Sequence, residues 1–127
     1  MIDYLVDTDV LIWYLRGNKK AKEIIKNLDF AISIVTYMEI IQGIRNKREL
    51  NTFKKFIKSW DIDVILINEE ISSKASFYME EFSLSHSMAL ADSLIAATAS
   101  TNGLILLTGN DKHYKFLDIA IEVFRVN

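Results

Sequence analysis

Asp7 is the first residue whose type and position could serve chemistry. It directly follows the apolar run 4–6, which is typical of a buried strand, and Asp9 comes two residues later. An Asp here often caps the following helix, because its side-chain oxygen accepts from the free backbone N–H groups of the first turn. It also stands at the carboxyl end of a strand, where α/β proteins collect ligands. The sequence leaves both roles open for Asp7.

Glu39 stands three residues after Thr36, which follows the apolar run 30–35. The pair matches a capping box, in which Thr36 caps a helix and Glu39 reaches back to its backbone. Taken alone, the capping interpretation is the stronger one. However, this helix would begin at the same edge of the sheet as Asp7, so a carboxylate in its first turn could face a shared cleft.

Asp92 is the acidic residue that is hardest to explain by structure alone. Its neighbours at 88–91 and 94–97 are all apolar. A charge in an apolar helix costs free energy unless it is paired or bound to a metal, and unpaired buried acids tend to be functional. A capping role would require the helix to begin at Ser93. The sequence favours a functional role for Asp92 over a capping role.

The segment Thr108-Gly109-Asn110-Asp111 follows another apolar run, at 104–107. It favours a turn, but it also places oxygen atoms at a further strand end. Carboxylates that a fold brings together repel one another, and a divalent cation removes that cost. Oxygen ligands select Mg²⁺ or Mn²⁺ rather than zinc. The sequence has no Cys and only two His, His86 and His113, which we interpret as non-catalytic because neither has a partner at metal-ligand spacing.

The elements that must position these acids alternate along the chain. Four continuous apolar runs and a weaker fifth predict buried parallel strands at 4–6, 30–35, 64–67, 104–107 and 119–124. Helical periodicity predicts helices at 10–15, 20–28, 36–46, 49–60, 71–82 and 90–101. Alternating strands and helices favour an α/β fold with right-handed crossovers. We therefore expect one domain, residues 1–127, folded as a three-layer α/β/α sandwich around a parallel sheet of four to five strands.

Composition limits the partners of this chain. Its formal net charge is -2 at pH 7, so it is not a polybasic protein that would coat nucleic acid. A solvated helix face is the favoured explanation of its basic clusters. The start of the sequence lacks the basic and apolar segments of a signal peptide, and no apolar run approaches the ~18 residues of a membrane span, so we expect a cytoplasmic protein. The best candidates for an RNA contact are Arg45, Lys47, Arg48, Lys54 and Lys55.

Taken in order, several stretches resemble the PIN-domain ribonucleases, specifically the short toxins of VapC type. These stretches are 5–12 (LVDTDVLI), 33–40 (SIVTYMEI) with Gly43, 91–99 (ADSLIAATA) and 106–110 (LLTGN). The resemblance runs from Asp7 to the last predicted strand, and the order and spacing of the stretches make it specific. It implies a ribonuclease that depends on Mg²⁺ or Mn²⁺ and is the toxin of a toxin–antitoxin pair. It also implies an RNA substrate, a cognate antitoxin and a homodimer.

The resemblance also assigns roles to individual residues. It implies that Asp7, Glu39 and Asp92 form the acidic catalytic core that binds the metal. Asn110 fills a fourth ligand position by its spacing from Thr108, and Asp111 stands beside it, so the choice between these two stays open. The implied reaction is hydrolysis of an RNA phosphodiester, with Glu39 positioning or deprotonating the water. The supporting residues would be Thr8, Asp9, Thr36 and Thr108.

Three other classes of protein compete with this interpretation. The start of the segment 7–11 is similar to the nucleophile motif of haloacid-dehalogenase-type phosphatases, but Leu11 stands where these need Thr or Val, and the chain lacks their later motifs. A response-regulator receiver would need an Asp where Asn68 follows the third predicted strand. The third alternative is a non-catalytic PIN-fold interaction module, against which the three acids at matching positions argue.

Overall fold

A computed structural model describes residues 1–126, and a parallel five-stranded sheet forms its centre. All neighbouring strands run parallel. The strands are β1 (Tyr4–Val6), β2 (Phe30–Ser33), β3 (Asp63–Ile65), β4 (Ile105–Thr108) and β5 (Ile121–Val123), in the spatial order β3-β2-β1-β4-β5.

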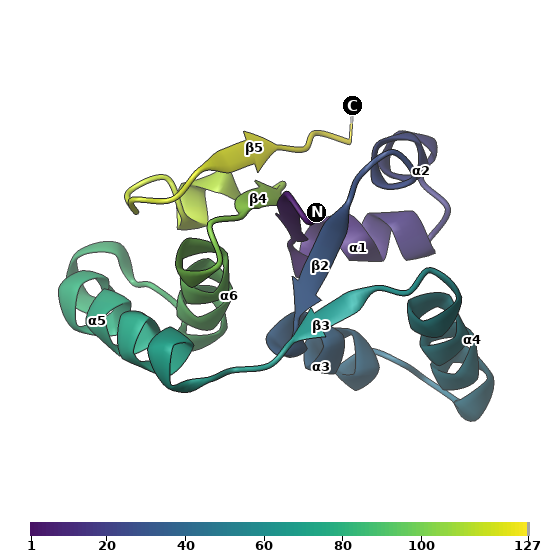
Figure 1. Ribbon diagram of the computed structural model, residues 1–127, viewed down its shortest axis with the longest axis horizontal. Helices are drawn as coiled ribbons and strands as arrows, with labels where there is room; N and C mark the ends of the chain where they lie inside the picture. The colour runs from purple at the N-terminus through teal and green to yellow at the C-terminus, as the bar shows by residue number, and fades with distance from the viewer. Residues whose placement is uncertain (127) are drawn as a thin grey trace.

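Helices cover both faces of this sheet. Figure 1 shows α5 and α6 on one side of the strands and α1, α2 and α4 on the other. No helix within residues 1–126 is long and apolar enough to cross a bilayer. The helices are α1 (Thr8–Leu15), α2 (Lys19–Ile25), α3 (Ile34–Gln42), α4 (Lys47–Ser59), α5 (Glu69–His86), α6 (Leu90–Thr101) and the short 3₁₀ helix η1 (Asp111–His113).

Successive strand residues fill two separate cores. Leu5 and Leu106 belong to the core beneath α5 and α6. Val6 and Leu107, the next residues along the same strands, belong to the core on the side of α1 and α2. Because side chains alternate across a sheet, runs that are apolar at every position bury both faces. The predicted three-layer α/β/α sandwich around a parallel sheet is confirmed.

The predicted strand at 30–35 is too long at its carboxyl end. β2 stops at Ser33, whose hydroxyl accepts from the backbone N–H of Val35 at 3.0 Å and caps α3. Ile34, although β-branched, already lies in the helix. The predicted capping box is therefore wrong, because Thr36 does not cap the helix and Glu39 lies in its second turn.

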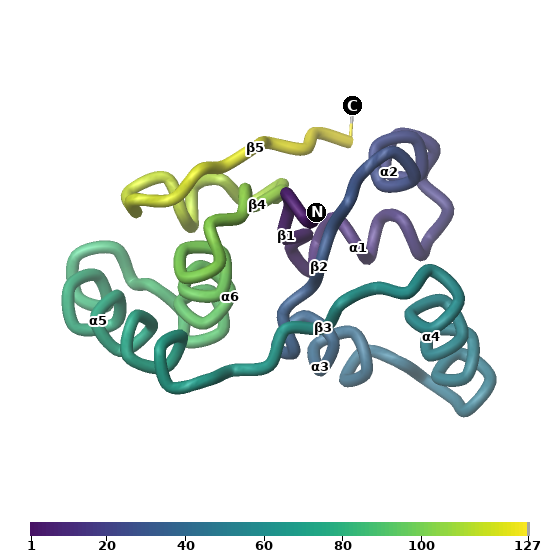
Figure 2. The backbone as a smooth tube through the Cα atoms, in the orientation of Figure 1, coloured from purple at the N-terminus to yellow at the C-terminus, as the bar shows by residue number. Residues whose placement is uncertain are grey.

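The order of the strands places β1 beside β4. The chain runs outward from β1 to β2 and β3 and then returns through α5 and α6 to β4, a path that Figure 2 follows from purple to yellow. Val6 pairs with Leu107, so the carboxyl ends of β1 and β4 are neighbours. Open α/β sheets bind ligands at such a switch point in strand order. Asp7 follows one of these two strands directly, and Thr108 ends the other.

Candidate active site

Asp7 caps α1 and also contacts the end of β4. Its Oδ1 accepts from the backbone N–H of Thr8 at 2.8 Å, and its Oδ2 accepts from the hydroxyl of Thr108 at 2.7 Å. The residue is only 4% exposed. Burial, followed by the charge of Asp9, raises its pKa to about 7, although the bonds from Thr108 and Thr8 oppose the rise. Asp7 therefore does cap α1. Its carboxylate is, however, much more deeply buried than the side chain of a helix cap usually is.

Asp9 fixes the loop that follows β4. Its Oδ2 accepts from the backbone N–H of Gly109 at 2.9 Å. A side chain at Gly109 would place its Cβ 2.5 Å from that same oxygen and 3.2 Å from the backbone oxygen of Phe124, so this close approach requires glycine. Burial raises the pKa of Asp9. Its Oδ1 is buried and has no hydrogen-bond partner among residues 1–126.

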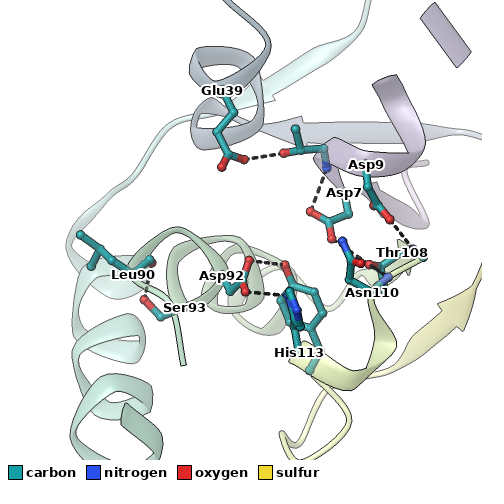
Figure 3. A network of polar contacts seen from close by, with 12 residues as sticks. Asp7, Asp9, Glu39, Leu90, Asp92, Ser93, Thr108, Asn110 and His113 are labelled. Atoms are coloured by element: carbon teal, nitrogen blue, oxygen red, sulfur yellow. Dashed lines mark hydrogen bonds and ion pairs between the residues drawn. The ribbon is translucent and has the colours of Figure 1, made fainter. Parts of the chain in front are cut away.

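Asp92 points from the first turn of α6 toward the segment after β4 (Figure 3). Its Oδ1 accepts from the hydroxyl of Tyr114 at 3.0 Å, and its Oδ2 lies 3.0 Å from Nδ1 of His113. The capping alternative is wrong, since α6 begins at Leu90 and Ala89 is its N-cap. The functional interpretation of Asp92 stays a prediction. Capping does not explain the side chain, but Asp92 is paired with Tyr114 and His113 and its side chain is 21% exposed, so it is not the unpaired buried acid that the sequence suggested.

Tyr114 lies close to both Asp7 and Asp92 and is fully buried. Burial first, and then the charges of these two acids, raise the pKa of Tyr114 far above its ordinary value. Its hydroxyl therefore stays protonated and donates to Asp92. The sequence interpretation passed over Tyr114 and set His113 aside. Both stand more than twenty residues from Asp92, so no local pattern could have linked them to it.

Glu39 is held on the α3 side of the site. The hydroxyl of Thr8 donates to its Oε1 at 2.6 Å and lies 2.9 Å from the hydroxyl of Thr36. Thr36 itself is buried. Thr8 links both acids, because its backbone N–H donates to Asp7 and its hydroxyl donates to Glu39.

Asn110 and Asp111 lie in different surroundings. Asn110 donates its backbone N–H to the hydroxyl of Thr108 at 2.9 Å, and Figure 3 shows it beside Asp7. Asp111 accepts from the guanidinium of Arg125 at 2.9 Å, and this contact lowers the pKa of Asp111. Arg125 also donates to the backbone oxygen of Gly109 at 2.9 Å. The carboxylate of Asp111 is thus committed to a partner outside the acidic group.

Four of the basic residues predicted to contact RNA line two hollows of the surface. Arg45 and Arg48 line a groove of about 600 Å³ that also reaches Glu39. Lys54 and Lys55 line a separate hollow beside Tyr37. Arg45 is moreover paired with Glu49 at 2.8 Å. The contact of this set with RNA stays a prediction.

Among the residues that the structure describes, the acids of the site are not paired with Lys or Arg. Within residues 1–126, no Lys or Arg forms an ion pair with Asp7, Asp9, Glu39 or Asp92. Over the same range, no three Asp, Glu, His or Cys side chains stand close enough together to chelate an ion by themselves. Mg²⁺ keeps several waters and takes one or two carboxylates from a protein, so this all-oxygen donor set fits such an ion.

Comparison with known proteins places this chain in a family. A model of the PIN domain matches residues 4–120, so the chain belongs to the PIN-domain family. Among its relatives is Ribonuclease VapC10 of Mycobacterium tuberculosis, which is 34% identical over 119 residues that cover 90% of this chain and 87% of the relative. The predicted resemblance to VapC-type PIN proteins is confirmed.

Solved structures agree with this assignment. A toxin–antitoxin complex from Klebsiella pneumoniae contains a chain with a TM-score of 0.77 and 25% identity, and the match covers 95% of this chain and 97% of that one. A chain of DNA-bound VapBC from Salmonella typhimurium has a TM-score of 0.83 at 22% identity, with 97% and 98% covered. The second likeness is one of fold alone.

Proposed function

We propose that this protein is a ribonuclease that depends on Mg²⁺ or Mn²⁺ and hydrolyses RNA phosphodiester bonds. The observation that carries the proposal is the pair Asp7 and Asp92. The hydroxyl of Tyr114 lies close to both carboxylates, Asp7 directly follows β1 at the switch point beside β4, and no Lys or Arg within residues 1–126 forms an ion pair with either acid. When bound there, a divalent cation would activate water and stabilise the charge that develops on the phosphate.

Each acid has its own part in this proposal. Asp7 and Asp92 hold the ion, and Glu39, fixed by the hydroxyl of Thr8, orients the attacking water and accepts its proton. Thr108 keeps Asp7 in place, and Asp9 keeps the loop after β4 in place. We assign the fourth ligand position to Asn110 rather than Asp111, because Asp111 is bound to Arg125.

The test is cleavage of a labelled single-stranded RNA with Mn²⁺ present. Asp7→Asn and Asp92→Asn should each lower the cleavage rate at least 100-fold, because each removes a proposed metal ligand. This loss corresponds to an increase of about 2.7 kcal/mol or more in the activation free energy. Asp63→Asn is the matched control, because Asp63 is an exposed acid at the start of the edge strand β3. A wild-type protein that never cleaves RNA would favour the non-catalytic interaction module instead.

We further propose an antitoxin as the partner of this chain. The groove between α1, α3 and α4 has an apolar floor that includes Ile12, Ile40 and Phe53, and a rim that carries Arg45 and Arg48. An apolar helix with acidic residues complements such a groove. Glu39 lines it as well, so the occupant would lie against the active site.

Expression in bacterial cytoplasm tests the toxin role directly. The wild-type chain should arrest growth when it is expressed without a partner, whereas Asp7→Asn should not. Equal growth of both strains at equal protein level would contradict the toxin role. We also expect the homodimer that the family resemblance implies, and light scattering of the purified protein measures it.

A further inference from the structure

Both oxygens of the Asp92 carboxylate are in contact with one short segment that follows β4. Tyr114 donates its hydroxyl to Oδ1 at 3.0 Å, and Nδ1 of His113 lies 3.0 Å from Oδ2. A cation that is to bind Asp92 must therefore coexist with these two side chains or replace one of them. The two are adjacent in sequence, but their surroundings differ.

Tyr114 has no room to move, whereas His113 does. The Tyr114 side chain is 0% exposed and packs in the core with Leu5 and Leu106. The side chain of His113 is 55% exposed. A rotation of Tyr114 would open the core, but a rotation of His113 exchanges one polar contact for water. Only His113 can therefore leave Asp92 at little cost in stability.

We propose that Tyr114 is a positioning residue that permanently holds Oδ1 of Asp92, and that His113 is a displaceable partner that gives up Oδ2 when a divalent cation binds. The inference rests on the proposed function, since it concerns the same carboxylate. Its physical basis is that a hydrogen bond to a metal-binding carboxylate fixes the orientation of that carboxylate, and loss of such a partner commonly lowers metal affinity 10–100-fold.

The chain offers a close control for the loss of a buried tyrosine hydroxyl. Tyr78 is also buried, and its hydroxyl donates to Asp118 at 2.9 Å on another part of the molecule. Tyr78→Phe and Tyr114→Phe therefore remove the same group from the same kind of bond and keep the ring that fills the core. A general effect of destabilisation should appear in both variants, and an effect on the active site in Tyr114→Phe alone.

The experiment measures Mn²⁺ affinity of the full chain from the signal of free Mn²⁺ in electron paramagnetic resonance. Tyr114→Phe should raise the dissociation constant about 10-fold or more. Tyr78→Phe should leave it within twofold, and His113→Ala should leave it unchanged or lower it. Circular dichroism checks that each variant is folded. If Tyr114→Phe does not fold, the Mn²⁺ affinity of His113→Ala alone tests the inference. Weaker Mn²⁺ binding by His113→Ala than by wild type would overturn it.

Failure of the inference can be told from failure of the proposed function. If wild-type Mn²⁺ binding does not depend on Asp92, as Asp92→Asn would reveal, both are overturned. If binding depends on Asp92 but Tyr114→Phe binds as tightly as wild type, only the role of Tyr114 is overturned. Equal weakening in Tyr114→Phe and His113→Ala would also overturn it, since His113 would then be a required partner.

Discussion

Replacement of Asp7 by Asn should stabilise the metal-free protein at neutral and alkaline pH, although it removes a residue of the active site. Asn keeps an oxygen for the backbone N–H of Thr8. Its amide N–H₂ can donate to the hydroxyl of Thr108, which has two lone pairs. The substitution therefore removes the buried charge and leaves one hydrogen bond to Thr8 and one to Thr108, although the hydroxyl of Thr108 then accepts where it had donated.

The size of the effect follows from the pKa of Asp7. A pKa of about 7 in the folded protein, against an ordinary value of 3.8, corresponds to about 4 kcal/mol of destabilisation when the carboxylate is ionised. Because the folded-state pKa is raised, the protonated acid favours folding. That stability is fully present below pH 3.8 and is lost as the pH rises to about 7. The amide of the Asp7→Asn variant has no proton to lose in this range, so the variant escapes this loss.

Urea unfolding of both proteins in EDTA, from pH 4 to pH 8, measures the difference in free energy of unfolding. As the pH rises, the free energy of unfolding of the variant should increase relative to that of wild type. The difference should level off at about 4 kcal/mol near pH 8. Asp63→Asn, an exposed acid, should show no such trend. A difference between Asp7→Asn and wild type that stays constant across this range would refute the assigned burial cost. Saturating Mn²⁺ at 100 times its dissociation constant should then stabilise only the wild type, by about 2.7 kcal/mol.

Three further substitutions test the loop after β4. Gly109→Ala should destabilise the protein by about 1–3 kcal/mol in urea unfolding, because the new Cβ would meet the Asp9 carboxylate at 2.5 Å and the backbone oxygen of Phe124 at 3.2 Å; stability equal to that of wild type would show that the loop can move aside. Asn110→Ala should lower the RNA cleavage rate about 10-fold, whereas Asp111→Asn should retain most of it. The reverse order of these two rates would assign the fourth ligand position to Asp111.

The bounds of helices and strands could be predicted where the hydrophobic pattern alone determines them. The strand at Tyr4–Val6 has the predicted bounds, because it is a continuous apolar run between Asp3 and Asp7. The helix at Leu90–Thr101, whose residues are mostly apolar, also has the predicted bounds. The run at 30–35 failed, since the hydroxyl of Ser33 ends β2 and starts α3 inside it. A local hydrogen bond thus outweighed the β-propensity of Ile34 and Val35.

The site was predictable only in part for a related reason. Asp7 and Asp92 stand out in sequence because each is an acid beside apolar residues. The roles of Tyr114 and His113 depend instead on where β4 lies relative to α6, and nothing near them in sequence encodes this contact. An aromatic residue in an apolar segment is ordinarily part of the core, and Tyr114 is that as well. The ring of Tyr114 packs in the core, and only its hydroxyl contacts Asp92.

The segment from Thr108 to Tyr114 explains how this fold tolerates its acids although no Lys or Arg within residues 1–126 pairs with them. Thr108 donates to Asp7, Gly109 to Asp9, and Tyr114 to Asp92, so neutral donors from one segment serve acids from two other elements. These bonds do not fully compensate for burial, because the pKa of Asp7 is still raised to about 7. The remaining cost is the destabilisation of the folded protein by the ionised, buried carboxylate of Asp7. A divalent cation that binds there would offset this destabilisation. A fold that neutralised Asp7 with a lysine would be more stable, but it would lose this preference for a cation.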